Sequence, residues 1–141
     1  MDSSHKLTFI ITTFNSAQVI DACLNKINFS NYRVIVVDNN SSDNTTEIVS
    51  NNYPLATLIK NKKNCGYGRA NNIGLRATTT PYALILNPDA FIFEEDLAKI
   101  INMMDKNSEI AIGAPMLLNS YPASENDRLN EIRIINNNLI T

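Results

Sequence analysis

The chain has 141 residues, of which 44% are hydrophobic and 18% charged, and its formal net charge is −2. This length suits one domain with its own core, so we expect a single domain over residues 1–141. No lysine and arginine run is long enough to predict a nucleic-acid-binding face. No apolar run reaches the roughly 20 residues of a membrane span, and the first residues lack a secretory pattern. We therefore expect a cytoplasmic protein with Cys23 and Cys65 reduced.

Short apolar runs alternate along the chain with segments of helical periodicity. The runs predict strands over residues 7–13, 32–37, 55–59, 82–86 and 110–114. The periodic segments predict helices over residues 17–28, 45–52, 69–77 and 94–105. Asn15 or Ser16 is expected to cap the first helix, and Asn44 or Thr45 to begin the second. The final segment, 128–141, fits a short helix or a strand.

Continuous apolar strands joined by helices predict an α/β fold, with a parallel sheet covered on both faces. Three of the strands end in distinctive polar residues. These strand ends are Thr12-Thr13-Phe14-Asn15, Asp38-Asn39-Asn40 and Asn87-Pro88-Asp89. Each alone would be an ordinary turn. Because ligands bind at the carboxyl ends of strands in such sheets, the three together predict a binding site.

The segment "CGYGRANNIG" partly matches a dinucleotide-binding fingerprint. Gly66 and Gly68 fit its first two glycines, but Asn71 stands at the position of the third. The segment also follows the third strand, whereas the fingerprint belongs to the first strand of its unit. We therefore expect no dinucleotide site, and the glycines instead allow close approach to a ligand or a positive φ. The ATP-binding P-loop pattern is absent from the sequence as well.

Two strand-end motifs leave a structural and a functional interpretation open. Asp38 bonds the turn backbone after its strand, or it lies with Asn39 against a pyrimidine base. Pro88 keeps Asn87 extended in a turn, while Asp89 is also a hard oxygen ligand. Mg²⁺ or Mn²⁺ is often held by one or two carboxylates with substrate phosphates and water, so one carboxylate suffices beside a diphosphate. The sequence has no histidine and cysteine cluster for zinc.

Four segments together, in order and spacing, resemble the GT-A glycosyltransferases of family 2. They are "TFIITTFNS", "YRVIVVDNNSSDNT", "NCGYGRANNIGL" and "YALILNPDAFI". The match is closest to the rhamnosyltransferase-like bacterial members that build surface polysaccharides. It covers residues 7–117, as the nucleotide-sugar-binding core, and leaves 118–141 as a partial acceptor-side segment or tail. The resemblance implies a Rossmann-like GT-A fold, mostly parallel and incomplete at the C-terminus.

The resemblance also implies an activity, namely transfer of a sugar with inversion from a nucleoside-diphosphate sugar, UDP- or dTDP-linked, to a hydroxyl. The acceptor would be a glycan or a lipid-linked molecule. Peripheral association of the parent enzyme with the inner face of the plasma membrane, and homo-oligomerisation, remain open. A non-catalytic nucleotide-binding or partner-binding module is the alternative. A sugar nucleotidyltransferase is disfavoured, because "TTFNSAQ" has no glycine and no basic residue after the first strand.

The family's functional positions carry over residue by residue. Asp38 and Asn39 stand where two aspartates are usual, and Asn87 replaces the first acid of the metal-binding pair. The donor-binding residues that the resemblance implies are Thr12, Thr13, Phe14, Asn15, Asp38, Asn39, Gly66, Arg69, Asn72 and Asn87. Asp89 is implied as the metal ligand, for Mg²⁺ or Mn²⁺.

The general base of the family is an acidic residue well beyond the metal aspartate. Three late acids are present, Glu125, Asp127 and Glu131, and none of them matches that position. The catalytic base is therefore not identified. We expect the chain to carry mainly the donor-binding half, to bind a nucleoside diphosphate weakly, and to give little or no turnover alone.

Overall fold

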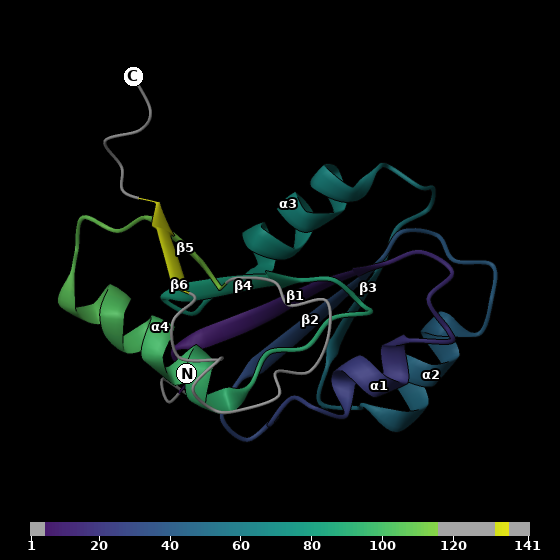
Figure 1. The fold of residues 1–141 in the computed structure, drawn as a ribbon. Coiled ribbons are helices and arrows are strands. Elements are labelled where there is room, and N and C mark those ends of the chain that lie inside the picture. The colour runs from purple at the N-terminus through teal and green to yellow at the C-terminus, as the bar shows by residue number, and fades with distance from the viewer. Residues whose placement is uncertain (1–4, 116–131, 136–141) are drawn as a thin grey trace. The chain divides into compact units, whose positions relative to one another are not determined.

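A computed structural model describes residues 5–115 and 132–135 of the chain. Two compact units follow one another, residues 1–91 and residues 92–141. The first unit contains a four-stranded sheet in the order β3-β2-β1-β4, in which every pairing is parallel (Figure 1). Its strands are β1 (Leu7–Thr13), β2 (Arg33–Asp38), β3 (Thr57–Lys60) and β4 (Tyr82–Leu86). The predicted parallel α/β sheet is thus confirmed.

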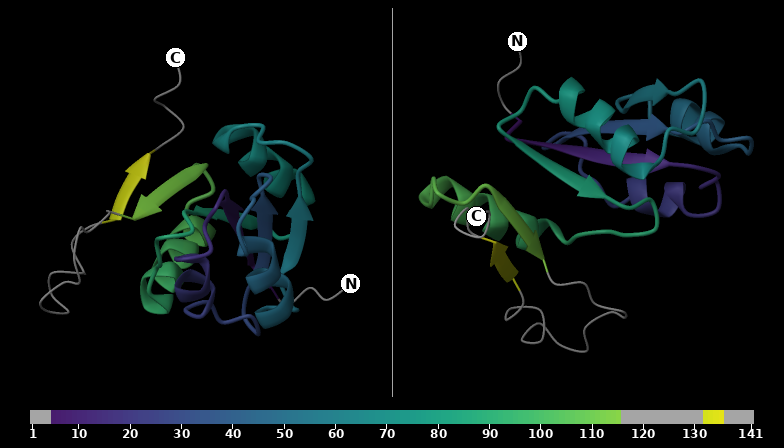
Figure 2. Two further views of the ribbon diagram at one scale, coloured as in Figure 1. Left: turned by 90° about the vertical axis from the view of Figure 1, so that its right-hand side faces the viewer. Right: turned by 90° about the horizontal axis from the view of Figure 1, so that it is seen from above.

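Three helices cover this sheet. They are α1 (Ile20–Leu24), α2 (Thr45–Asn52) and α3 (Tyr67–Ala77). Seen along the strands in the left view of Figure 2, α3 lies on one face, and α1 with α2 lies on the other. All seven residues of β1 are buried, as its central position and its unbroken apolar run require. The prediction of helices on both faces is therefore confirmed.

The side chains of β1 and β2 alternate between the two faces. Ile10 and Val37 face α3, where Gly74 of that helix meets them. A Cβ atom at Gly74 would collide with Ile10 Cγ2 and would lie 3.3 Å from Val37 Cγ2. The glycine therefore lets α3 approach the sheet closely, and it places the first turn of α3 beside the carboxyl ends of the strands.

The first predicted helix is much shorter than residues 17–28. Within the described residues no side chain caps α1; instead the N–H groups of Val19 and Ile20 both donate to the carbonyl of Ser16, at 3.0 Å. Past the helix, Asn28 Oδ1 accepts from the N–H of Ser30, at 3.1 Å. The α-helical pattern ends before that, because the N–H groups of Lys26 and Ile27 donate three residues back, to the carbonyls of Cys23 and Leu24, at 3.2 and 3.1 Å.

The third strand begins later than predicted. The N–H of Ala56 donates to the carbonyl of Tyr53, at 2.9 Å, which closes a turn where residues 55 and 56 were expected to be extended. Leu55 lies in this turn and is 76% exposed. Its apolar side chain suggested a buried strand, but the preceding Pro54 starts a turn instead.

The second unit is described by itself. It contains α4 (Glu94–Lys106), β5 (Ile112–Pro115) and β6 (Ile132–Ile135). Gly113 of β5 lies within about 4 Å of Ile100 and Met104 of α4, as measured from a Cβ built on the glycine. The fifth predicted strand does not extend the parallel sheet, because β5 pairs antiparallel with β6. Of the two structures that fitted the final segment, a strand is therefore formed at 132–135.

Some predictions lie outside the described residues. These are the structure of residues 116–131 and 136–141, with the three late acids Glu125, Asp127 and Glu131. Among the helices that the structure does describe, none is long and apolar enough to cross a membrane.

Candidate functional site

The carboxyl ends of β1 and β2 are joined by hydrogen bonds. Thr13 Oγ1 donates to Asp38 Oδ1 at 3.0 Å, and the N–H of Asn39 donates to the carbonyl of Thr13 at 2.8 Å. Asn61 continues the edge, since its N–H donates to the carbonyl of Asp38 at 2.8 Å. Parallel strands deliver these loops to the same edge of the sheet. The structure therefore brings together the polar residues predicted at the first two strand ends.

The carboxylate of Asp38 is occupied by protein donors. It is 2% exposed, and besides Thr13 it accepts from the N–H of Ser41, at 3.0 Å, and from Ser41 Oγ, at 2.5 Å. The interpretation in which Asp38 bonds the turn backbone is thus confirmed. Its contact with a nucleobase stays a prediction. Ser41 was not singled out in the sequence, because a serine in a polar turn gives no signal of its own.

The amide of Asn39 is held in one orientation. Oδ1 accepts from the N–H of Cys65, at 2.9 Å, and from Asn61 Nδ2, at 3.1 Å, while Nδ2 donates to Asn64 Oδ1 at 2.8 Å. Because a backbone N–H only donates, the atom that faces it must be the oxygen. Asn39 is 2% exposed and ties the loop after β2 to the loop after β3. Its Nδ2 carries a second N–H besides the one donated to Asn64.

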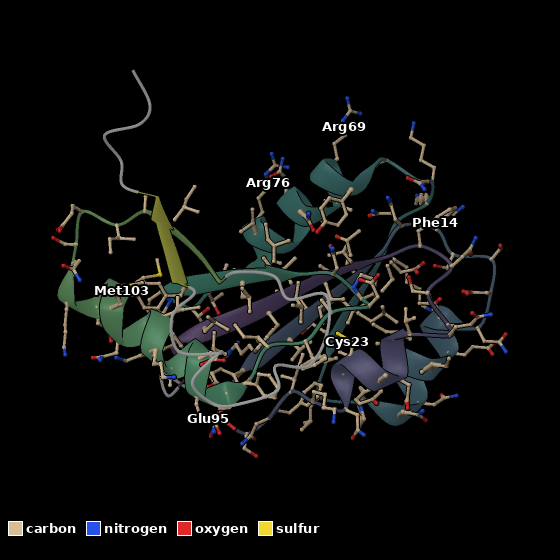
Figure 3. The ribbon with its side chains drawn as sticks, in the orientation of Figure 1. Phe14, Cys23, Arg69, Arg76, Glu95 and Met103 are labelled. Carbon is tan, nitrogen blue, oxygen red and sulfur yellow. The ribbon has the colours of Figure 1, made fainter. Side chains whose placement is uncertain are left out.

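The loop after β1 presents an aromatic ring. Phe14 is 50% exposed, and Figure 3 shows it in the loop that follows β1. The next residue, Asn15, has φ of 49°, and its Oδ1 accepts from the N–H of Ser42 at 2.8 Å. Its own N–H donates to Ser41 Oγ at 2.9 Å. Asn15 therefore fixes the backbone next to Phe14, whose exposed face is suited to stacking on a planar ligand.

Asp43 anchors the same loop to α2. Its two carboxylate oxygens accept from Thr45, through both the N–H and Oγ1, and from the N–H of Ala17. Burial alone would raise the pKa of Asp43, but the hydrogen bonds from Thr45 and Ala17 outweigh it and lower the pKa below its usual value. Asp43 thus supports the start of α2.

The first turns of α3 bring a second set of residues to the edge. Thr12 Oγ1 donates to Asn71 Oδ1 at 2.7 Å, and both side chains are buried. Gly66 precedes the helix with φ of 86°, the positive φ expected for a glycine of this segment. Arg69 and Asn72 are exposed, and Figure 3 shows the Arg69 side chain directed away from the sheet. In the sequence, Asn71 stands out only as the residue that replaces the third glycine of the fingerprint. The feature that could have identified its role is a polar residue on the inward face of a predicted helix.

The loop after β4 contains the predicted metal ligand. The carbonyl of Asn87 accepts from the N–H of Ala90 at 3.1 Å, which closes the turn around Asp89. The Asn87 Oδ1 accepts from the Tyr67 hydroxyl at 2.7 Å, and the Cys23 thiol donates to the Asn87 carbonyl at 3.8 Å. Asp89 itself is exposed.

The pKa of Cys23 is affected by the charge of this loop. Burial, followed by the negative charge of Asp89, raises the pKa of the Cys23 thiol to about 11. At neutral pH the thiol is therefore protonated and is a poor metal ligand.

The residues present fit a hard divalent ion. Within residues 5–115 and 132–135, no group of three or more histidine, cysteine and acidic side chains is placed to hold a metal by itself. Asp89 offers one exposed carboxylate, an oxygen donor of the kind that Mg²⁺ and Mn²⁺ prefer. Such an ion would complete its shell with water and, in the complex, with oxygens of a bound phosphate group.

A parallel sheet with helices on both faces and a polar carboxyl edge defines the Rossmann-like class of α/β proteins. Residues 8–137 match the model of Glycosyl transferase family 2, and the chain belongs to this family. The family resemblance and the GT-A fold deduced from the four segments are thereby confirmed.

The chain is similar to several curated proteins. An uncharacterized glycosyltransferase of Mycobacterium tuberculosis (strain ATCC 25618 / H37Rv) is 29% identical over 107 residues, covering 76% of this chain and 47% of that protein. The dolichol-phosphate mannosyltransferase of Pyrococcus furiosus is 28% identical over 116 residues, covering 77% of this chain and 33% of the enzyme. The chain thus spans less than half the length of these relatives.

Solved structures share the fold. A mannosyltransferase from Pyrobaculum calidifontis, in complex with GDP-Man and Mn²⁺, has a TM-score of 0.66 and 28% identity, covering 74% of this chain and 33% of that one. TarS of S. aureus, in complex with UDP-GlcNAc, has a TM-score of 0.66 and 24% identity, covering 79% and 37%. The likeness to TarS concerns the fold alone.

Proposed function

We propose that this chain binds a nucleoside-diphosphate sugar with Mg²⁺ or Mn²⁺, and that its activity is inverting transfer of the sugar, of the hexosyl type, to an acceptor hydroxyl. The observation that carries the proposal is the carboxyl edge of the sheet. There the ends of β1 and β2 are tied together around Asp38, and the loop after β4 presents the exposed carboxylate of Asp89. Membership of Glycosyl transferase family 2 supports the same activity.

Each part of the edge has a proposed role in binding. The exposed ring of Phe14 stacks on the nucleobase, and Asn39 donates its remaining N–H to a base oxygen. Thr12, Thr13, Asn15 and Asp38 act by holding these two loops in place. Gly66, Arg69, Asn72 and Asn87 are assigned to the diphosphate and the donor sugar, whose phosphate oxygens the two amides would bind. The exposed Arg69, which is directed away from the sheet in the free chain, would turn toward the diphosphate on binding.

Asp89 would hold the divalent ion. When bound, such an ion neutralises the negative charge that develops on the diphosphate leaving group. The mannosyltransferase that binds GDP-Man and Mn²⁺ is 28% identical to this chain and supports a divalent ion here. Because that relative binds GDP-Man, GDP is tested in addition to UDP and dTDP.

The transfer step rests on the family. A general base must take the proton of the acceptor hydroxyl, and no described residue is assigned to that role. We therefore expect residues 1–141 to bind the donor with little turnover. The acceptor, a glycan or a lipid-linked molecule of polysaccharide synthesis, is proposed on the same ground. A cytoplasmic location, peripheral membrane association and self-association are also proposed from membership of the family.

A thermal-shift panel tests the proposal. UDP, dTDP and GDP are each added with and without Mn²⁺ to the 141-residue chain. A ligand at 100 times its Kd stabilises the folded state by about 2.7 kcal/mol, which raises the Tm by several degrees. We expect one diphosphate to raise the Tm only when Mn²⁺ is present, and Asp89→Ala to remove that increase.

Glu47→Ala is the matched control, because it also removes one exposed carboxylate from the first unit. It should leave the Mn²⁺-dependent shift unchanged. The site assignment fails if none of the three diphosphates raises the Tm, or if Asp89→Ala keeps a metal-dependent shift of the wild-type size.

A further inference from the structure

Tyr67 links the start of α3 to the loop that contains Asp89. Its hydroxyl donates to Asn87 Oδ1 at 2.7 Å, across 20 positions of the sequence. Tyr67 is the first residue of α3, and its ring is 50% exposed. An apolar core position would bury the ring, so packing alone does not account for a tyrosine here.

The position of Tyr67 is set by the turn before it. Gly66 has φ of 86°, a conformation that residues with side chains rarely adopt, and its N–H donates to Asn64 Oδ1 at 2.9 Å. Asn64 in turn accepts from Asn39 Nδ2 at 2.8 Å. The tyrosine is therefore connected, through two asparagines, to the buried end of β2.

Asn87 is constrained at two groups. Its Oδ1 is taken by Tyr67, and its carbonyl accepts from Ala90 at 3.1 Å and from the Cys23 thiol at 3.8 Å. The side-chain oxygen is then directed toward α3, so the amide presents its Nδ2 hydrogens elsewhere. Asn87 is a donor toward a ligand in this arrangement, while Asp89, two residues later, supplies the carboxylate.

We propose that Tyr67 is a positioning residue for the metal-binding loop: its hydroxyl holds the Asn87 amide and so fixes the turn that presents Asp89 to a divalent ion. The inference rests on the proposed function for the identity of the ion. The hydroxyl acts through Asn87 and does not touch the metal.

The test compares two tyrosines of the same chain. Tyr67→Phe removes only the hydroxyl that contacts Asn87. Tyr53→Phe removes a comparable hydroxyl, which donates to Asp21 Oδ1 at 2.9 Å and to the Asp21 carbonyl at 3.0 Å. Both variants keep their ring and lose hydrogen bonds at exposed positions, so a general loss of stability affects the two alike.

The first readout uses the ¹⁵N-labelled 141-residue chain with Mn²⁺ alone as the probe. Mn²⁺ broadens the NMR signals of nearby amides, so the backbone N–H groups of Asp89 and Ala90 report binding. Loss of one hydrogen bond corresponds to a change of roughly 3–10-fold in an equilibrium constant. We expect Tyr67→Phe to require that much more Mn²⁺ for half-broadening, and to shift the Asn87 side-chain amide signals. Tyr53→Phe should change neither.

A double-mutant cycle separates positioning from a direct contact. If Tyr67 acts through Asn87, then Asn87→Ala together with Tyr67→Phe should bind Mn²⁺ no more weakly than Asn87→Ala alone. Asn87→Asp keeps an acceptor for the hydroxyl and adds a carboxylate, so it should bind Mn²⁺ more tightly than the wild type. Additive losses in the double variant would overturn the inference.

Two other outcomes also overturn it: equal Mn²⁺ midpoints for Tyr67→Phe and the wild type, or no broadening around Asp89 in the wild-type chain. Failure of the proposed function gives a different result. In that case no nucleoside diphosphate binds, yet the Mn²⁺ midpoints of Tyr67→Phe and Tyr53→Phe still differ, and the positioning role stands.

Discussion

At the scale of single residues, the side chains at the strand ends are of two kinds: some are buried and hold the loops in place, and others are exposed to solvent. Asp38 and Asn39 are each 2% exposed and are bonded by several protein donors and acceptors. Phe14 and Asp89, in contrast, are exposed. The sequence predicts that all four lie at strand ends. It does not show which of them are buried and bonded and which are exposed, because partners such as Ser41 and Cys65 lie elsewhere in the chain.

Cys23 gives a prediction at this scale. Its pKa is raised to about 11 from an ordinary value of 9.0, mainly by burial and secondarily by Asp89. The unfolded chain therefore ionises its thiol first, and this contribution to stability is complete below about pH 9. It is lost as the pH rises from about 9 to about 11, and is on the order of 1–3 kcal/mol. Urea unfolding at pH 7, 9 and 10.5, under reducing conditions, measures it.

Cys23→Ala is the comparison for that experiment. The variant is less stable throughout, because it leaves a small cavity, but its free energy of unfolding should fall less between pH 9 and 10.5. Tyr53, whose pKa is raised to about 12 mainly by burial and by Asp21, contributes to both proteins, and only its smaller interaction with the Cys23 thiolate is absent from the variant. An identical decline in the two proteins would contradict the assignment. Alkylation at pH 8 should also modify the partly exposed Cys65 before the buried Cys23.

At the scale of elements, α3 is the helix whose placement matters for the site. It carries Asn71 against Thr12, and Tyr67 against Asn87. Its closeness to the sheet depends on Gly74, which has no room for a Cβ beside Ile10. The helical periodicity predicted this element. Its buried residues are Ala70, Asn71 and Gly74, a small and partly polar set, and the partly buried Ile73 packs beside Ala70.

Two glycines of α3 test this packing. Gly74→Ala should destabilise the chain by about 1–3 kcal/mol, because the new methyl group overpacks a buried site. Gly68→Ala lies in the same helix, with nothing within 4 Å of the new Cβ, and should stabilise by up to about 1 kcal/mol. Urea unfolding of both variants checks the sign. Equal effects of the two substitutions would show that helix propensity, and not packing, decides.

Two elements have other bounds than predicted, because local hydrogen bonds and turns end or delay them. The apolar pattern of residues 17–28 is helical, yet α1 ends at Leu24, and Asn28 bonds its own neighbouring backbone. Likewise β3 begins at Thr57, since the turn from Tyr53 to Ala56 comes first. Hydrophobic spacing identifies an element well, but its ends depend on side-chain bonds and turns that spacing does not contain.

At the scale of the whole molecule, charge is unevenly distributed. Although the chain has a net charge of −2, residues 48–88 contain five cations and no acid. These are Lys60, Lys62, Lys63, Arg69 and Arg76, all of them exposed. Lys60 ends β3, and Lys62 and Lys63 lie in the loop after it, which Asn39 holds. Figure 3 shows both arginines on the outer side of α3. This segment therefore carries a net positive charge, part of which lies in the loop after β3, at the carboxyl edge of the sheet.

We expect binding of a nucleoside diphosphate with Mn²⁺ to weaken several-fold as KCl rises from 0.1 M to 1 M. The screening length falls from about 10 Å to about 3 Å over that range, so the attraction of the cations is lost. Lys62→Gln with Lys63→Gln should bind more weakly at 0.1 M and depend less on salt. Lys26→Gln, outside this region, is the control. Calorimetric titration that gave the same salt dependence for all three proteins would refute a role for the charge.

The sequence by itself determined the parallel α/β sheet, the family, and the strand ends at which the polar residues gather. These features could be predicted because each is encoded by residues that are close together in the chain, as apolar runs and their spacing are. Only the tertiary structure decided that β5 pairs with β6, that Asn39 is bonded by three residues of another loop, and that Tyr67 reaches Asn87. Those contacts join residues 17 or more positions apart in the chain, and no local pattern of hydrophobicity or charge encodes them.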